Sequence, residues 1–175
     1  KRTRLLSVSA VQYATGLRLN VQQLGDFCRH ANIFYCIDGI QAIGAMHFDA
    51  RACQADFVVA DGHKWLLGPE GLGLFYCRAE VRNQLTLRQH GWHMVEQSTD
   101  FMSERWQVAD SARRFEPGSP NMLAIHALAA SVSLLLEVGM QRVEHAILSH
   151  INYLAEFIHS QADLECLSDI RPGRY

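Results

Sequence analysis

Short apolar runs alternate with longer segments of helical periodicity in the first half of the chain. Four runs are bounded by polar residues or glycines, which is typical of buried strands, and they cover residues 5–11, 33–37, 56–60 and 72–77. Between the first two runs, Asn20 is a suitable N-cap for a helix from Val21 to Ala31. The last two runs are too close together for a crossover helix, so their strands should be antiparallel. The pattern predicts an α/β fold with a mostly parallel sheet and one reversed strand.

The end of the chain has a helical pattern. Ser119 and Pro120 have the residue types of an N-cap and a first helical position, so we expect a helix from Pro120 to about Val138. A second, amphipathic helix should follow over residues 140–161. Gly139 separates the two helices, and we expect the domain boundary there. The boundary divides the chain into residues 1–138 and 139–175.

Two residues at the ends of predicted strands indicate a chemistry. Asp38 ends the apolar run 33–37, and Lys64 follows the run 56–60. Ligands of open α/β sheets bind beyond the carboxyl ends of strands, so both side chains should reach one crevice. Pyridoxal phosphate needs such a pair, because a carboxylate keeps its pyridine nitrogen protonated and a lysine holds its aldehyde carbon as a Schiff base. Taken alone, a lysine after a strand is most often a solvated surface residue.

The combination of Asp38, Gln41, His63 and Lys64 is a more specific signal than any one of these residues alone. It resembles the aspartate, glutamine, histidine and lysine of the class V aminotransferase family, which includes the cysteine desulfurases, and the spacings agree. The resemblance extends from about residue 5 to about residue 136. It includes two further segments in the family's order, residues 68–73 and 117–121.

The resemblance implies a fold and a domain organisation. Residues 1–138 would be the C-terminal part of the pyridoxal phosphate-binding large domain of fold type I, a three-layer α/β domain. Residues 139–175 would start the small C-terminal domain. Family members carry more sequence on both sides, including a phosphate-binding loop and a residue that stacks on the pyridine ring. We therefore expect a fragment of a longer enzyme that is inactive in isolation.

The resemblance also implies residue roles around the cofactor. Lys64 would form the Schiff base, and Asp38 would pair with the pyridine nitrogen. Gln41 would donate a hydrogen bond to the phenolic oxygen of the cofactor. His63 would act next to the lysine, close to the phosphate and the aldimine, although an isolated histidine in such a corner is more often structural.

The phosphate of the cofactor would be contacted from the partner subunit of a homodimer. In the family, the segment that matches Gly118 and Ser119 reaches this phosphate across the interface. A helix N-terminus has unpaired backbone N–H groups and a positive dipole end, which favour a dianion. The bland interpretation is that Ser119 and Pro120 are only capping residues.

Two positions depart from the family pattern. Tyr13 stands where cysteine desulfurases usually have an asparagine, in a segment that contacts cofactor or substrate. Asp61 stands where relatives commonly have a serine or threonine whose hydroxyl donates to the phosphate. An ionised carboxylate facing a phosphate is repulsive, so Asp61 must turn away, take a proton or pair with a cation.

The reaction is open to several interpretations. We expect an aminotransferase-like enzyme that acts on an amino acid, with a cysteine desulfurase as the alternative. Desulfuration needs a mobile nucleophilic cysteine, and Cys166 is the late candidate, although its surroundings at 164–167 predict a strand. A truncated, non-catalytic paralogue is a further possibility. A dinucleotide-binding domain is disfavoured, because the glycines of 68–73 lack Gly-x-Gly-x-x-Gly spacing and do not open a helix.

Composition restricts the possible partners. The 175 residues, 49% of them hydrophobic, can bury a domain-sized core. A net charge of -2 gives no sign of nucleic-acid binding, and no apolar stretch has membrane-spanning length. Five cysteines without a Cys-x-x-Cys pair indicate a reducing cytosol, so we expect a cytoplasmic protein. Residues 87–116 predict a long polar loop, and no metal site is expected.

Overall fold

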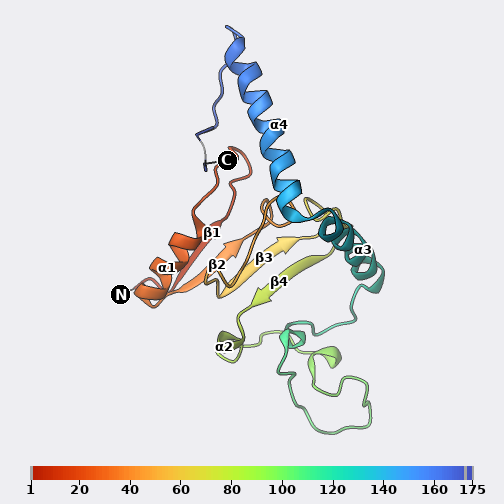
Figure 1. Ribbon diagram of the computed structural model, residues 1–175. Helices are drawn as coiled ribbons and strands as arrows, with labels where there is room; N and C mark the ends of the chain where they lie inside the picture. Colours follow the sequence, from red (N-terminus) through yellow and green to blue (C-terminus); the bar gives the residue numbers. More distant parts are fainter. Residues whose placement is uncertain (1, 172, 175) are drawn as a thin grey trace.

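The computed structural model describes residues 2–171 and 173–174. The ends of the two predicted domain segments, at Lys1 and Tyr175, lie outside the described residues. The elements follow in the order β1 (Leu5–Ser9), α1 (Val21–Ala31), β2 (Phe34–Asp38), β3 (Phe57–Asp61), β4 (Gly73–Cys77), α2 (Ala79–Arg82), η1 (Trp92–Met94), η2 (Ala112–Phe115), α3 (Met122–Val138) and α4 (Met140–Ser160) (Figure 1).

The four strands form one mixed sheet in the order β1-β2-β3-β4. The pairs β1–β2 and β2–β3 are parallel, whereas β3–β4 is antiparallel, which confirms the predicted reversal. Backbone hydrogen bonds continue past the strand ends, with Ala10 N donating to Asp38 O at 2.9 Å and Gly39 N donating to Val59 O at 2.8 Å. The carboxyl ends of β1, β2 and β3 are thus fastened together at one edge.

One face of the sheet packs against α1. Tyr35, Ile37 and Val58 alternate with residues of the other face and are buried. The helix is capped as predicted, because the Asn20 side chain accepts from Gln23 N. Gly25 of α1 lies so close to the backbone after β2 that a Cβ there would be 2.0 Å from Cys53 O, and a larger residue would push the helix off the sheet.

The opposite face carries a row of phenylalanines. Phe34, Phe57 and Phe75 come from neighbouring strands with ring centroids about 6 Å apart, at 5.9 and 6.2 Å, and Phe115 packs edge-on against the last of them. This face is less covered in the described residues, since Phe75 is 44% exposed. On this face the middle of β4 is therefore partly open to solvent.

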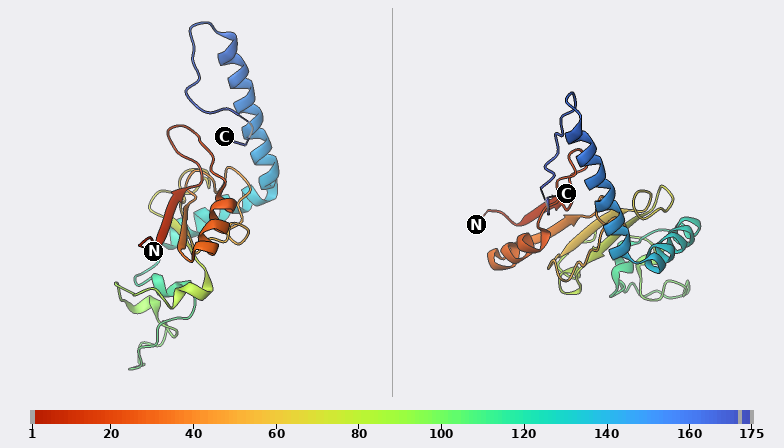
Figure 2. Two further views of the ribbon diagram at one scale, coloured as in Figure 1. Left: turned by 90° about the vertical axis from the view of Figure 1, so that its left-hand side faces the viewer. Right: turned by 45° about the horizontal axis from the view of Figure 1, so that its top comes forward.

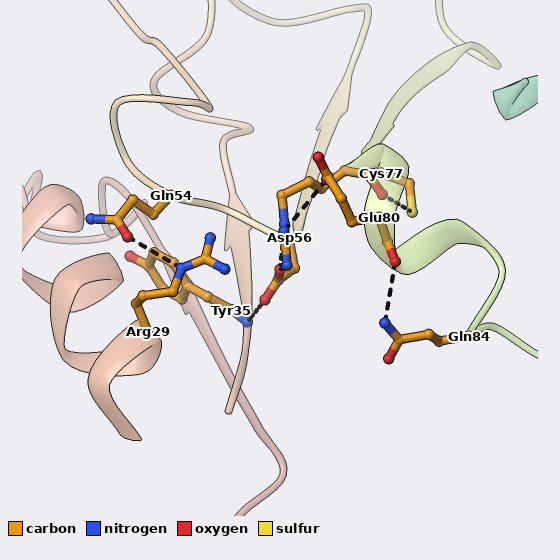
Figure 3. A network of polar contacts seen from close by, with 8 residues as sticks. Arg29, Tyr35, Gln54, Asp56, Cys77, Glu80 and Gln84 are labelled. Carbon is orange, nitrogen blue, oxygen red and sulfur yellow. Dashed lines mark hydrogen bonds and ion pairs between the residues drawn. The ribbon is translucent and has the colours of Figure 1, made fainter. Parts of the chain in front are cut away.

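A buried carboxylate, Asp56, joins three strands at the end of the sheet opposite the carboxyl ends of β1, β2 and β3 (Figure 3). Asp56, 5% exposed, precedes β3 and accepts from the backbone N–H of Tyr35 in β2 at 2.9 Å. Its other oxygen accepts two hydrogen bonds from Arg78, which follows β4, at 2.8 and 2.6 Å. The Arg78 backbone N–H also donates to Asp56 O. These bonds fix the ends of β2, β3 and β4 relative to one another.

The predicted start of α3 is wrong by two residues. Asn121, not Ser119, is the N-cap, because its side chain accepts from Ala124 N at 3.1 Å and the helix begins at Met122. Both residue types are good caps, so the sequence alone did not decide between them. Ser119 and Gly118 consequently lie in the exposed connection before the helix.

Gly139 separates α3 from α4 as expected, and the two helices meet at a bend of 79°. The helix α4 stands out from the sheet, and the segment after it runs back along the helix (Figure 2). The strand predicted at 164–167 is absent from the described residues, which have no regular secondary structure there. No single described helix is long and apolar enough to cross a membrane; α3 and α4 reach that length and composition only as a bent pair.

The predicted long loop is confirmed in the described residues, with small elements inside it. The short 3-10 helices η1 and η2 lie between α2 and α3, and an isolated bridge pairs Val95 with Val108. Arg113 stabilises this arrangement by donating to the carbonyl oxygens of Val95 and Glu96.

Candidate functional site

Asp38 is the last residue of β2, and two neighbours hold its carboxylate. Ser9 at the end of β1 donates its hydroxyl to Oδ2, and the backbone N–H of Ile40 donates to Oδ1, both at 2.9 Å. These two hydrogen bonds fix the orientation of the carboxylate. Each oxygen keeps a further lone pair for a ligand. Sequence reasoning missed Ser9, although it is paired with Asp38 in the parallel register.

A glycine allows the turn after β2 to contact the loop after β3. Gly44 has φ of +96°, and a Cβ there would lie 2.4 Å from Trp65 O and 2.9 Å from Leu66 N. Only a residue without a side chain permits this approach in this conformation. The contact brings Gln41, in the same turn, to Trp65, whose indole Nε1 donates to Gln41 Oε1 at 2.9 Å.

Lys64 lies three residues after the end of β3, in an electrostatic cluster. Its Nζ is 3.6 Å from Asp61 Oδ2, and His63 Nε2 is 3.8 Å from the same oxygen. The sequence left three possibilities for Asp61: turning away, protonation or pairing with a cation. The structure shows pairing with a cation, the Lys64 amine. The Oδ1 of Asp61 is buried and accepts no hydrogen bond from the described residues. A buried acceptor without a donor is costly, so this oxygen favours a ligand or side chain that brings an N–H or O–H.

The lysine content of the sequence supports the choice of Lys64. Lys1 and Lys64 are the two lysines of the chain, and the other strongly basic residues are arginines. Lysine differs from arginine in having an amine that can lose its proton, as Schiff-base chemistry requires. This signal was available from the sequence alone.

The predicted site residues fall into two groups. Asp38 ends β2, and Gln41, His63 and Lys64 lie on the turns after β2 and β3, which the Gly44 contact joins. Gly118 and Ser119 lie before α3, and no hydrogen bond within the described residues joins them to the first group.

A cavity of about 440 Å³ opens beside Gln41 and Trp65. Its wall is mainly apolar and includes Tyr13, whose side chain is largely exposed, and Ile147 and Ile151 of α4. A larger hollow of about 700 Å³ lies at the opposite edge of the sheet, around Asp56. The buried charges there already neutralise each other, so the smaller cavity is the better candidate for a ligand. Of Asp38, Gln41, His63 and Lys64, Gln41 alone lines this cavity, so it adjoins the proposed cofactor residues rather than containing them.

Three cysteines are poorly suited to nucleophilic chemistry. Burial raises the pKa of the thiols of Cys28, Cys53 and Cys77, which keeps them protonated. Cys166 is half-buried and its thiol lies 3.7 Å from Ser168 O. Within the described part of the chain, no three His, Cys, Asp or Glu side chains gather in a way that could hold a metal ion.

Two sequence comparisons give matches over most of the chain. The family described as Aminotransferase class-V matches residues 1–173. A probable cysteine desulfurase of Methanothermobacter thermautotrophicus is 30% identical over 167 residues, which cover 95% of this chain and 41% of that protein.

Two solved structures have the same fold. The apo cysteine desulfurase of Thermococcus onnurineus superposes with a TM-score of 0.80 at 26% identity, covering 89% of this chain and 38% of that one. The cystine C–S lyase C-DES, in complex with its reaction product cysteine persulfide, gives a TM-score of 0.88 at 23% identity, covering 99% of this chain and 46% of that one. The chain thus spans less than half the length of these relatives.

Proposed function

The chain belongs to the class-V aminotransferase family, and from this premise we propose that the protein is a pyridoxal phosphate-dependent enzyme that acts on an amino acid. The observation that carries the proposal is the placement of Asp38 and Lys64 at neighbouring strand ends. When bound, pyridoxal phosphate supplies an electron sink for the bonds of the substrate's α-carbon. The proposed linkage is a Schiff base on the Lys64 amine.

The residues fit the ring of this cofactor. Asp38 offers a fixed carboxylate that can accept from a protonated ring nitrogen, and the bonds from Ser9 and Ile40 hold it ready. Gln41 offers an amide N–H to an oxygen of the ring. His63, beside Lys64, can hold or move a proton near the amine.

The fit to the phosphate is less complete. Asp61 presents an acceptor without a donor, and a phosphate dianion brings no proton to it. The nearby Lys64 and His63 partly offset this charge. We propose that Gly118 and Ser119, in the loop before the N-cap of α3, contact the phosphate of the cofactor bound to the partner subunit in a homodimer.

Two reactions are candidates for the parent enzyme. Aminotransfer is one, and cysteine desulfuration is the other, which the named relatives favour. A specific observation also favours desulfuration: Cys166 lies in an irregular segment, whose Ser168 and Ile170 line the same cavity as Gln41. A thiol on such a segment can move more readily than one on a strand.

The domain organisation is part of the proposal. Residues 1–138 would belong to the cofactor-binding large domain, and residues 139–175 would start the small domain. The bend at Gly139 and the projection of α4 from the sheet support this division.

Reductive labelling tests the cofactor assignment. The protein is mixed with pyridoxal phosphate, reduced with borohydride and digested, and the peptides are analysed by mass spectrometry. We expect the adduct on the Lys64 peptide and its loss in Lys64→Arg, which keeps the charge but has no condensing amine. Since Lys1 is the other lysine, its peptide is an internal control. An adduct confined to Lys1, or its persistence elsewhere in Lys64→Arg, would refute the assignment.

Product analysis separates the two reactions. A desulfurase supplied with cysteine releases sulfide in the presence of a thiol, and Cys166→Ser should reduce this release while leaving Lys64 labelling unchanged. An aminotransferase instead forms a keto acid, and Cys166→Ser should not affect it. Asp38→Asn should retain the cofactor and slow either reaction strongly, because loss of a preorganised charge raises the barrier by several kcal/mol, on the order of 3.

A further inference from the structure

The hydrogen bond between Trp65 and Gln41 determines which end of the Gln41 amide is available to a ligand. An indole N–H is only a donor, so it can bond the carbonyl oxygen of an amide and not its NH₂ group. The bond of 2.9 Å to Gln41 Oε1 therefore assigns the orientation of the amide, which the two similar ends would otherwise leave open.

The other end of this amide is left to donate. Within the described residues, Gln41 Nε2 donates to no protein oxygen, and it is not among the buried polar atoms that lack a partner. The backbones of both residues are fixed, because the Gly44 contact joins their loops. Gln41 is thus held as a donor before any ligand arrives, which reduces the entropy lost on binding.

We propose that Trp65 is a positioning residue that turns Gln41 into an obligatory hydrogen-bond donor toward a ligand held between Asp38 and Lys64. The site then selects a ring with an acceptor oxygen and discriminates against a ring that lacks one. This inference rests on the proposed cofactor for the identity of the ring. The orientation of Gln41 itself does not depend on the cofactor.

A measurement without cofactor tests the orientation. The chain has three tryptophans, so the indole N–H signals of Trp65, Trp92 and Trp106 can be assigned by single Trp→Phe variants. We expect Gln41→Leu to speed hydrogen exchange of the Trp65 indole several-fold, whereas Gln41→Glu, which keeps an acceptor, should preserve the protection. Equal exchange of the Trp65 indole in the unmodified protein, Gln41→Leu and Gln41→Glu would overturn the proposal, whether or not the protein binds pyridoxal phosphate.

Equilibrium binding tests the consequence for the ligand. We expect Trp65→Phe and Gln41→Leu each to weaken binding of pyridoxal phosphate by about twofold to tenfold, the range for one neutral hydrogen bond. The double variant should bind like the weaker single variant, because both changes remove the same donor. Trp106→Phe, a change at an exposed loop position, is the matched control and should bind as the unmodified protein does.

A cofactor analogue completes the test. For 3-deoxypyridoxal phosphate, which lacks the phenolic oxygen, Trp65→Phe should not weaken binding. An equal loss for both ligands, or multiplicative losses in the double variant, would show that Trp65 acts only through general packing. If the full-length protein and its variants bind neither ligand, the proposed function fails, and the indole exchange still decides whether Trp65 orients Gln41.

Discussion

Replacing Arg78 by alanine should destabilise the fold more than any change of a surface ion pair. Asp56 is 5% exposed, and Arg78 supplies both hydrogen bonds to its Oδ1. The variant leaves a buried carboxylate whose remaining protein donor is Tyr35 N. Removing one partner of a buried ion pair typically costs about 3–5 kcal/mol. The Arg78 side chain is 25% exposed, so in the variant water can replace some of the hydrogen bonds that Arg78 donates to Asp56. We therefore expect the lower end of that range, about 3 kcal/mol.

Urea unfolding followed by circular dichroism measures this loss. With an m-value of about 1–3 kcal/mol/M, the midpoint should fall by roughly 1–3 M. Glu80→Ala is the matched control, since Glu80 is 69% exposed and its 3.4 Å contact with Arg78 should contribute less than about 1 kcal/mol. Equal effects of Arg78→Ala and Glu80→Ala would refute the reasoning.

Three further predictions concern backbone, pH and charge. Gly16→Ala should lower the free energy of unfolding by about 1–2 kcal/mol, because Gly16 has a positive φ. Gly44→Ala should lower it by more, because Gly44 has a positive φ and also faces backbone atoms. Equal losses in urea unfolding would contradict this. Burial raises the pKa of Cys28 and Cys53 above 9.0, so the unfolded chain loses these protons first and stability should fall as pH rises above about 9. Cys53→Ala should flatten that decline between pH 8 and 10. Asp61→Asn should strengthen binding of pyridoxal phosphate but not of pyridoxal, which has no phosphate; parallel changes for the two ligands would argue against repulsion.

Much of the fold followed from local patterns. The apolar runs located all four strands, and the short connection before β4 predicted its reversal. Asn20 located the start of α1 because its surroundings offered no competing cap. The start of α3 was misplaced, since Ser119 and Asn121 are both suitable N-caps and the structure uses Asn121.

The site was less accessible to sequence reasoning. The sequence predicted that β2, which ends at Asp38, and β3, which precedes Lys64, are neighbouring parallel strands, and the structure confirms this pairing. The bonds from Ser9 to Asp38 and from Trp65 to Gln41 join residues 29 and 24 positions apart. Such bonds depend on how loops pack, which the positive φ of Gly44 controls here and no periodicity records.

The alternation of side chains along β2 and β3 also disfavours a shift in the register of these strands. Asp38 and Asp61 point to the phenylalanine face, whereas Ile37 points to the core under α1 and Ala60 is buried on that same side of the sheet. A slip of one residue in either strand would turn a carboxylate into that core, where an unpaired charge is strongly unfavourable. A misregistered sheet would therefore be disfavoured during folding, so Asp38 and Asp61 act as a check on the register of their own strands.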